Sequence, residues 1–268
     1  MLPKLGIIAG NGSLPEQIAK LYQAKGGECF LADINSGLEQ RNLNSKSFSI
    51  GSVGGIIDYF TENAVQKIII VGGIDRPDLK SLKVDLAGSV LLARVLKGKL
   101  LGDDNVLKIV AAYVESKGFE VISPMEVLNS GDYTNSLSSK KSLSKQDKDD
   151  IEIGKDVIKS LGHMDVGQAV IVLDGYVLGI EAAEGTDNLI KRCAALRKKD
   201  KGGVLVKMSK PGQDMRLDTP VIGPETARLL AEHGFSGVAV EKDGVIVIDP
   251  QETLAALDDA GVFLWLLK

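Results

Sequence analysis

The sequence predicts an α/β protein of two domains, a Rossmann-like domain with a parallel sheet followed by a mixed α/β domain, joined by a linker. Two apolar runs, Leu5–Ala9 and Lys67–Val71, end in glycines and are separated by helical patterns, which is typical of buried parallel strands. After about residue 129, serine, lysine and aspartate replace large apolar residues, and this change of composition indicates the linker. A chain of 268 residues is also long enough for two domains.

The composition excludes several classes of function. A net charge of −4 does not favour general nucleic-acid binding, so any phosphate site must be built from local cations. The two histidines, His163 and His233, are isolated, which argues against catalytic zinc and histidine-rich two-metal phosphoesterases. Cys29 and Cys193 lack a partner motif and indicate idle thiols in a reducing compartment. With no leader pattern and no apolar run of membrane-spanning length, we expect a cytoplasmic protein, at most peripheral to a membrane.

The first candidate binding feature is the turn Gly10–Ser13, which leads into a helical pattern from Leu14 to about Lys25. Strand, glycine turn and helix N-terminus in succession form an anion site from backbone N–H groups and the helix dipole. Pro15 stands where the third glycine of the dinucleotide fingerprint G-x-G-x-x-G would fall, so the fingerprint is incomplete. An ordinary strand–helix turn therefore remains an equal alternative.

A second glycine turn, Gly72–Pro77, follows the strand expected at Lys67–Val71. Ligands of open parallel sheets bind beyond the carboxyl ends of the strands, so Gly10–Ser13 and Gly72–Arg76 should face one crevice. Taken alone, Arg76 can equally be an ordinary surface residue. The other elements expected in the first domain are strands at Cys29–Asp33, Ser47–Ile50 and Phe119–Ile122, and helices at Val53–Asn63, Asp85–Gly98 and Asn105–Lys117.

The linker is expected over Asn129–Asp150 and is followed by a helical pattern from Ile151 to Leu161. The domains are therefore placed at residues 1–128 and 165–268, with a linker and helix at 129–164. Two apolar runs separated by three residues then predict a β-hairpin. The elements expected in the second domain are strands at Ala169–Leu173, Val177–Glu181, Gly203–Val206, Gly237–Glu241 and Val245–Asp249, a last strand ending at Leu267, and helices ending near Arg197, spanning Pro224–His233 and starting at Gln251.

The most charged loop is Lys207–Gly223, KMSKPGQDMRLDTPVIG. Pro211 and Pro220 argue against a helix there, because each removes a backbone donor and restricts its neighbour. Cations alternate with carboxylates in this loop, as a site needs in order to hold a phosphorylated anion and to place a metal ion or activate water. A solvated loop with surface ion pairs is the alternative that spacing alone leaves open.

The turn Glu181–Asp187 combines acidic groups with a glycine and a threonine between a strand and a helix. Thr186 or Asp187 can be the N-cap of that helix. The acidic groups can equally hold magnesium or orient a phosphate. The local sequence leaves both interpretations open.

Four blocks of the sequence, in order, resemble the LpxI family of bacterial UDP-2,3-diacylglucosamine pyrophosphatases. They are GIIAGNGSLP, VGGIDRP, VLGIEAAEGTD and KMSKPGQDMRLDTPVIG, and the resemblance extends over nearly the whole chain. It implies magnesium-dependent hydrolysis of UDP-2,3-diacylglucosamine to UMP and 2,3-diacylglucosamine 1-phosphate (lipid X), in the lipid A synthesis of Gram-negative bacteria. It also places the family's key aspartate, in R-x-D-x-P, at Asp218.

The resemblance further implies an active site between the two domains. The cations of the charged loop would neutralise the pyrophosphate and stabilise the leaving phosphate, and Asp218 would hold Mg²⁺ or orient the attacking water. The catalytic candidates are Asp218, Asp214, Lys207, Lys210 and Arg216; the substrate-binding candidates are Gly10, Asn11, Gly12, Leu14, Pro15, Gly72, Gly73, Arg76, Glu184, Gly185, Thr186, Asp187 and Gln213; and the magnesium candidates are Asp218, Asp214 and Glu184.

The expected partner is a glycolipid nucleotide rather than a nucleic acid. Transient contact with the cytoplasmic face of the inner membrane is expected through apolar surface near Leu91–Leu101. Monomer and homodimer both stay open. Two other functions also stay open: a Rossmann-type dinucleotide-dependent oxidoreductase, which would leave the charged loop unexplained, and a non-catalytic sugar-nucleotide binder, which would use the same cations without turnover.

Overall fold

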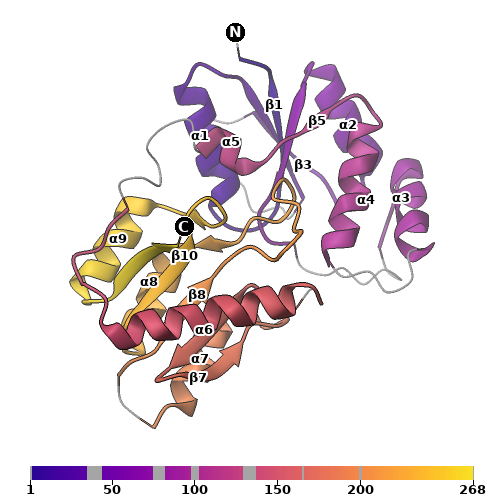
Figure 1. Ribbon diagram of the computed structural model, residues 1–268. Helices are drawn as coiled ribbons and strands as arrows, with labels where there is room; N and C mark the ends of the chain where they lie inside the picture. Colours follow the sequence, from indigo (N-terminus) through magenta and orange to yellow (C-terminus); the bar gives the residue numbers. More distant parts are fainter. Residues whose placement is uncertain are drawn as a thin grey trace. The chain divides into compact units, whose positions relative to one another are not determined.

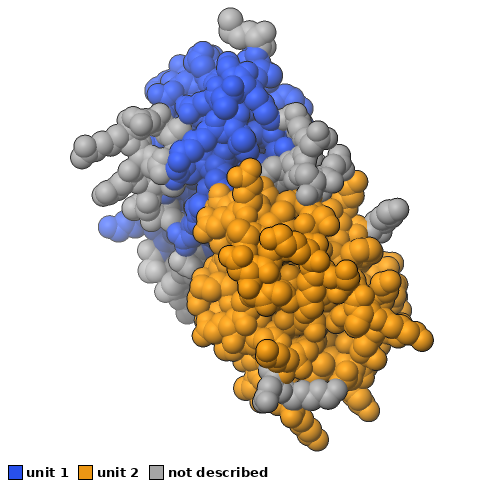
Figure 2. All heavy atoms as spheres, turned by 90° about the vertical axis from the view of Figure 1, so that its left-hand side faces the viewer, with its two compact units in different colours: residues 1–130, 214–218 blue, residues 131–213, 219–268 orange. Residues whose placement is uncertain are grey.

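A computed structural model describes residues 2–34, 44–74, 82–97, 103–128, 137–164, 166–198 and 201–267. The chain divides into two compact units, which Figure 2 colours separately. The first comprises Met1–Ser130 together with Asp214–Asp218, and the second comprises Gly131–Gln213 and Thr219–Lys268. Each unit contains strands of a sheet with helices beside it, so the α/β class predicted from the sequence is confirmed. Within the described residues, no helix has both the length and the apolar character needed to cross a bilayer.

The sheet of the first unit is entirely parallel, with the strand order β3-β2-β1-β4-β5. Its strands β1 and β4 are continuous apolar runs, as expected of strands with helices on both faces of the sheet. The chain adds β2 and β3 on one side of β1 and then β4 and β5 on the other, so the topological switch point lies between β1 and β4. The strands are β1 (Leu5–Ala9), β2 (Cys29–Asp33), β3 (Asn44–Ser47), β4 (Lys67–Val71) and β5 (Glu120–Val121).

One strand lies earlier than the sequence indicates. The apolar residues predict a strand at Ser47–Ile50, but β3 is the polar stretch Asn44–Ser47, which is exposed at the edge of the sheet. Phe48 and Ile50 pack against the core just after the strand. The apolar signal therefore comes from side chains that cover the core and not from the strand itself.

Helices lie on both faces of this sheet, as Figure 1 shows. α1 and α5 pack together on one face, and α2 and α4 cover the other, where their apolar side chains share a core with Ile8, Ile68 and Ile70 of the strands. α3 packs against α2 and α4 on the outside of this layer. The helices are α1 (Leu14–Ala24), α2 (Val53–Glu62), α3 (Leu86–Lys97), α4 (Asp103–Glu115) and α5 (Pro124–Leu128), of which α5 is not predicted by the sequence pattern.

Five residues from the later part of the chain, Asp214–Asp218, belong to the first unit. The side chain of Leu217 is only 6% exposed and joins the same core, together with Val121 of β5. The hydroxyl of Ser123, just after β5, donates a hydrogen bond of 2.9 Å to the carbonyl oxygen of Met215. The first unit is thus built from two separate parts of the sequence, which the sequence pattern does not indicate.

The second unit holds a mixed five-stranded sheet with the order β12-β10-β8-β6-β7 and a separate two-stranded parallel sheet, β11-β9. β6 and β7 form the predicted antiparallel hairpin, and β8, β10 and β12 run parallel to one another. The two strands expected on either side of Lys242–Gly244 belong to different sheets. The strands are β6 (Ala169–Leu173), β7 (Tyr176–Ile180), β8 (Val204–Lys207), β9 (Val221–Ile222), β10 (Gly237–Glu241), β11 (Ile246–Val247) and β12 (Phe263–Leu267).

Alternate side chains of this sheet face two different helix layers. Val170 and Val172 pack with α6, whereas Ala169 and Ile171 join the core under the other three helices. Since β6 is antiparallel to both of its neighbours, β7 runs in the direction of β8, and their carboxyl ends meet those of β10 and β12 at one edge. Ligands bind at such an edge in α/β proteins. The helices are α6 (Lys145–Gly162), α7 (Thr186–Leu196), α8 (Pro224–Glu232) and α9 (Pro250–Asp259).

The segment expected to be an exposed linker is partly packed. Leu137 is buried in the core of the second unit. α6 begins at Lys145, well before its apolar pattern, because a capping box at Ser144–Asp147 satisfies the first backbone donors of the helix. Within residues 137–150, Leu137 and Asp150 are buried and the other side chains are exposed or half-buried, so the expectation of an exposed tether is contradicted only at these two residues and by the start of α6. Residues 129–136 lie outside the described part of the chain.

Replacing Leu217 with alanine should destabilise the first unit, although the residue lies late in the sequence. Removing a buried leucine side chain costs about 2–5 kcal/mol. Leu196→Ala, at a leucine of α7 that is 55% exposed, is the matched control, and it should change the free energy of unfolding by about 0.5 kcal/mol or less. Urea-induced unfolding measures both values. Equal stability of the two variants would mean that Asp214–Asp218 does not belong to this core.

Candidate functional site

The two glycine turns of the first unit lie side by side at the switch point of the sheet. The amide of Gly10 donates to the carbonyl oxygen of Val71 (2.8 Å), and Asn11 and Gly73 exchange two backbone hydrogen bonds (2.7 and 3.0 Å). A Cβ atom at Gly10 would lie 2.5 Å from the carbonyl oxygen of Gly73, so only glycine fits there without a backbone shift. The parallel-sheet argument predicted this adjacency, and it places the backbone of both turns where such sheets bind ligands.

α1 begins directly after the first of these turns. Its N-cap residue, Ser13, makes no side-chain hydrogen bond to the backbone amides of the first helical turn. Leu14 and Pro15 are buried, so they pack the start of α1, and the fixed φ of a proline suits that position. Gly12 has a φ of +98°, a conformation that favours glycine. Arg76 lies outside the described residues.

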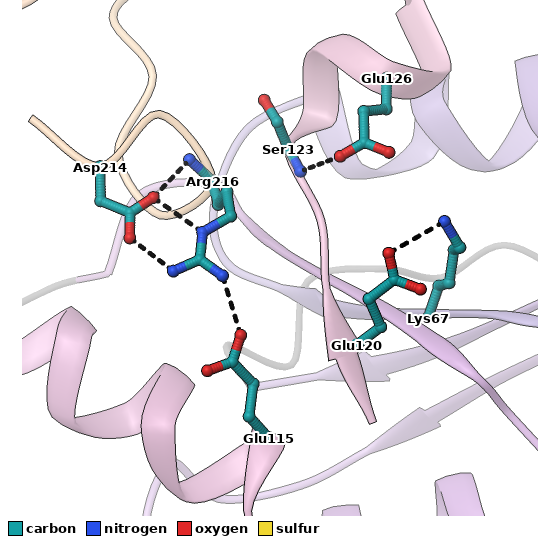
Figure 3. Close-up of polar contacts among 7 residues, drawn as sticks. All are labelled: Lys67, Glu115, Glu120, Ser123, Glu126, Asp214 and Arg216. Atoms are coloured by element: carbon teal, nitrogen blue, oxygen red, sulfur yellow. Dashed lines mark hydrogen bonds and ion pairs between the residues drawn. The ribbon is translucent and has the colours of Figure 1, made fainter. Parts of the chain in front are cut away.

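The charged segment is organised by one guanidinium group (Figure 3). Arg216 donates from Nε to Oδ1 of Asp214 (3.0 Å) and from Nη2 to Oδ2 (2.7 Å), which makes a bidentate ion pair. Its Nη1 donates to Oε1 of Glu115, the last residue of α4 (2.8 Å). The hydrogen bonds from Arg216 hold the pKa of Asp214 below its ordinary value, and those to Asp214 and Glu115 raise the pKa of Arg216.

This ion pair fixes the turn that carries Asp218. The backbone amides of Leu217 and Asp218 donate to the carbonyl oxygen of Asp214 (2.9 and 3.3 Å). The amide of Arg216 donates to the carboxylate of Asp214 (3.1 Å). Asp214 is thus bound to Arg216 through both carboxylate oxygens, which suits it to orienting the guanidinium. Asp218 lies half-buried at the end of the anchored turn.

In the second unit, the carboxyl edge of the sheet carries a buried polar group. Lys207, the last residue of β8, donates from Nζ to the hydroxyl of Thr186 (2.6 Å), and that hydroxyl donates to Oε1 of Glu181 (2.7 Å). Lys207 and Glu181 are 5% and 7% exposed. Neither Thr186 nor Asp187 is the N-cap of α7, because that position is Gly185, with a φ of +78°. The N-cap interpretation is therefore wrong, and the hydroxyl of Thr186 serves the lysine and the glutamate instead.

Two further predicted residues are held by local partners. Glu184 accepts hydrogen bonds from Arg192 (2.5 Å) and from the amide of Ala182 (3.2 Å), and the bond to Arg192 holds the pKa of Glu184 below its ordinary value. The side-chain oxygen of Gln213 accepts from the amide of Lys210 (2.7 Å) and so closes the turn between them. Glu184 and Gln213 therefore shape the loops that carry them.

The described residues contain no cluster of three Asp, Glu, His or Cys side chains suited to a metal ion. Of the three predicted magnesium ligands, Asp214 and Glu184 are each bound to an arginine. Mg²⁺ is commonly held by one or two carboxylates together with substrate phosphates and water, so a cage of protein ligands is not required. Asp218, on the anchored turn, is the candidate that suits this arrangement.

Arg192 and Glu115 were not predicted from the sequence, and Glu181 was included only as one of the acidic groups of the turn Glu181–Asp187. Glu181 stands inside the block VLGIEAAEGTD, and its place directly after a strand is a signal that could have identified it. Arg192 and Glu115 carry no such signal, because charged residues are common on helix surfaces. Glu115 is also 101 residues from its partner in the sequence.

Most of the chain matches known proteins. The model of the LpxI N-terminal domain matches residues 4–130, and the model of the LpxI C-terminal domain matches residues 134–265. UDP-2,3-diacylglucosamine pyrophosphatase LpxI of Caulobacter vibrioides is 32% identical over 269 residues, which cover 97% of this chain and 96% of that protein. Among solved structures, CobK precorrin-6A reductase matches over 99% of this chain and 87% of that chain, at 12% identity and a TM-score of 0.31. At this identity and TM-score, the match supports no conclusion about fold or function.

The lowered pKa of Asp214 predicts a pH-dependent contribution to stability. The ion pair with Arg216 stabilises the folded state above the ordinary pKa of the aspartate, 3.8, and this contribution is lost as the pH falls through the lower pKa of the folded state. At pH 7, Asp214→Asn should lower the free energy of unfolding by about 1 kcal/mol, a value reduced by the solvent exposure of the arginine. Urea unfolding from pH 7 down to pH 2.5 should show the gap between wild type and variant closing below pH 3.8.

The control for this series is Glu225→Gln, which removes an exposed ion pair with Arg228 on α8. At physiological salt this substitution should leave the stability unchanged, because exposed pairs are screened. A gap between wild type and Asp214→Asn that stays constant down to the lowest pH would contradict the assignment of the lowered pKa to Asp214.

Proposed function

Since the chain belongs to the LpxI family, we propose that it hydrolyses the pyrophosphate of UDP-2,3-diacylglucosamine and releases UMP and 2,3-diacylglucosamine 1-phosphate, a step of lipid A synthesis. The observation that carries the proposal is the match of both domain models along the chain, together with 32% identity to a protein named for this activity. The proposal assigns roles to groups of each unit.

Hydrolysis of a pyrophosphate requires neutralised charge on the non-bridging oxygens, a positioned water and a stabilised leaving phosphate. In the proposed reaction, the backbone amides of Gly12 and Ser13 bind phosphate oxygens, and the hydrogen bonds of Gly10, Asn11 and Gly73 hold the two turns together beside them. The N-terminus of α1, which has no side-chain cap, adds the positive end of its dipole. This arrangement binds an anion without a charged side chain, which suits a domain of an acidic protein.

The cations of the charged loop supply the remaining positive charge. Arg216 uses three of the five N–H groups of a guanidinium on Asp214 and Glu115, which leaves two for phosphate oxygens. Because its orientation is already fixed, little conformational entropy is lost when it binds the substrate. Lys207 and Lys210 are assigned to the same anion from the second unit.

Asp218 is proposed to orient the attacking water or to share Mg²⁺ with the substrate phosphates. When bound, Mg²⁺ would neutralise non-bridging oxygens of the pyrophosphate. The turn that carries Asp218 is anchored by Leu217 in the core and by the ion pair of Arg216, so the carboxylate is presented from a fixed backbone. Asp214 and Glu184 are assigned to the orientation of arginines and not to the metal.

A diacylated substrate is held in a membrane, and α3 offers an apolar surface for transient contact with it. Leu86, Val90 and Leu96 are 86%, 45% and 64% exposed, and they lie within about a third of the circumference of the helix. In the region expected from the sequence, Leu91–Leu101, Leu91 is buried and Leu96 is exposed, and residues 98–101 lie outside the described part of the chain. The exposed apolar surface therefore lies on a side of α3 that excludes Leu91. An exposed apolar stripe of this kind is typical of a helix that lies on a membrane.

The charges around this face favour an anionic membrane. Residues 82–97 contain Lys83, Arg94 and Lys97 and a single acidic residue, Asp85. The two carboxylate oxygens of Asp85 accept hydrogen bonds of 2.7 Å from backbone amides at the starts of α2 and α3. Its negative charge is thus directed at two positive helix N-termini, and Lys83 and Arg94 are proposed to meet lipid phosphates.

Asp218→Ala tests the assignment of the catalytic carboxylate. Loss of a base or metal ligand should lower kcat for UMP release by on the order of 10²–10⁴-fold. The Kd of the intact substrate should change little, because the cations and glycine turns remain. Asp58→Ala, at an exposed aspartate of α2, is the control and should keep both values. Turnover of Asp218→Ala within a few-fold of wild type would remove Asp218 from the catalytic residues.

Leu86→Ser with Leu96→Ser tests the membrane contact. Sedimentation with vesicles of phosphatidylglycerol and phosphatidylethanolamine should show binding weakened by about tenfold per leucine, if each contributes about 1.4 kcal/mol of apolar burial. Leu196→Ser, at a comparably exposed leucine of α7, is the control and should bind as wild type does. Unchanged vesicle binding, with a dimer that dissociates in the double variant, would assign α3 to a homodimer interface instead.

A further inference from the structure

The buried polar group of the second unit joins three elements at one sheet edge. Lys207 ends β8, Glu181 follows β7 directly, and Thr186 begins α7. β6 lies between β7 and β8. Its residue Ala169 pairs with Lys207 on one side, and on the other its carbonyl oxygen accepts a hydrogen bond from the amide of Glu181. The lysine and the glutamate therefore start two strand spacings apart, about 10 Å. The hydroxyl of Thr186 bridges the gap, with hydrogen bonds of 2.6 and 2.7 Å.

The bridge has a fixed direction. An ammonium group only donates, so the hydroxyl of Thr186 accepts from Lys207 and gives its single proton to the carboxylate of Glu181. Both ends of the bridge are more than nine-tenths buried. Buried polar groups that lose a partner are costly, so the three side chains hold one another in place. Without Glu181, the hydroxyl would turn to another acceptor and would no longer fix the ammonium group.

Glu181 is also tied to the charged loop. Its Oε2 accepts from the amide of Gln168 (3.4 Å), and the side-chain oxygen of Gln168 accepts from Gln213 (3.2 Å). Gln213 closes the turn that begins at Lys210. One buried carboxylate is thus connected to the groups that place both lysines of the loop.

We infer that Glu181 is a positioning residue, which acts through the hydroxyl of Thr186 to hold the ammonium group of Lys207 at the carboxyl edge of the sheet for a phosphate of the substrate. Glu181 itself does not touch the substrate. The inference rests on the proposed function for the identity of the ligand, but the hydrogen bonds that carry it do not. Displacement of a binding group by about 1 Å can lower a rate by on the order of 100-fold, so the effect is measurable.

A double-mutant cycle tests whether Glu181 acts through Thr186. Glu181→Ala and Thr186→Val should each lower kcat/KM for UMP release by about 10- to 100-fold. The double variant should be no more than about twofold worse than either, because the first substitution already breaks the bridge. Thr186→Ser keeps the hydroxyl and should stay within about threefold of wild type.

The matched control is Thr253→Val. It removes a buried threonine hydroxyl bond, to the carbonyl oxygen of Ile248 (2.6 Å), elsewhere in the second unit. It therefore measures what such a substitution does to activity through stability alone, and kcat/KM should stay close to the wild-type value. A loss in Thr253→Val as large as that in Thr186→Val would overturn the positioning role.

Lysine labelling separates this inference from the proposed function. Brief acetylation with acetic anhydride, followed by mass spectrometry, reports the reactivity of Lys207 relative to that of Lys20, which is exposed in the first unit. Glu181→Ala and Thr186→Val should raise relative labelling of Lys207 several-fold, because the amine loses one of the hydrogen bonds that hold it, whereas Thr186→Ser and Thr253→Val should not.

The two readouts fail independently. Suppose that the wild-type protein releases no UMP, but that labelling of Lys207 rises in Glu181→Ala and Thr186→Val. This result would refute the proposed function and support the positioning role. Unchanged labelling of Lys207 in Glu181→Ala would overturn the inference. Losses that multiply in the double variant would also overturn it, since Glu181 would then act by a route other than Thr186.

Discussion

The guanidinium group of Arg216 joins Asp214, in its own turn, to Glu115 at the end of α4, which lies 101 residues earlier in the sequence. With Leu217 in the core, it attaches a short piece of the later chain to the first unit. Arg216 exposes 42% of its side chain, so the ion pair contributes only about 1 kcal/mol to stability. Its main effect is orientation, because a bidentate pair fixes both planar groups, and the same turn then carries Asp218.

In both units, the groups assigned to substrate lie where strands end. At the switch point of the first sheet, Gly10 lets the turn after β1 approach the turn after β4, where we propose that backbone amides bind phosphate. At the corresponding edge of the second sheet, a buried lysine is held by a threonine and a glutamate. In this acidic chain, with a net charge of −4, the proposed binding of a pyrophosphate thus relies on these local groups and requires no basic surface.

The sequence predicted most elements of the fold because apolar periodicity records which face of a strand or helix is buried. It predicted the meeting of the two glycine turns for the same reason, since the carboxyl ends of parallel strands share an edge. It missed the packing of Leu217 in the first unit, because a single leucine in a polar loop has no period. It also missed Glu115 and the hydrogen bond of Glu181 to Thr186, because these partners come within hydrogen-bond distance only in the folded chain.

We propose that this chain cleaves a sugar-nucleotide pyrophosphate. Purified wild-type protein, incubated with UDP-2,3-diacylglucosamine and Mg²⁺, should release UMP and 2,3-diacylglucosamine 1-phosphate in equal amounts, and a chelator should stop the reaction. Substrate that binds but is recovered intact would identify a sugar-nucleotide binder. A bound nicotinamide cofactor, with no UMP released from the substrate, would contradict the account in favour of an oxidoreductase.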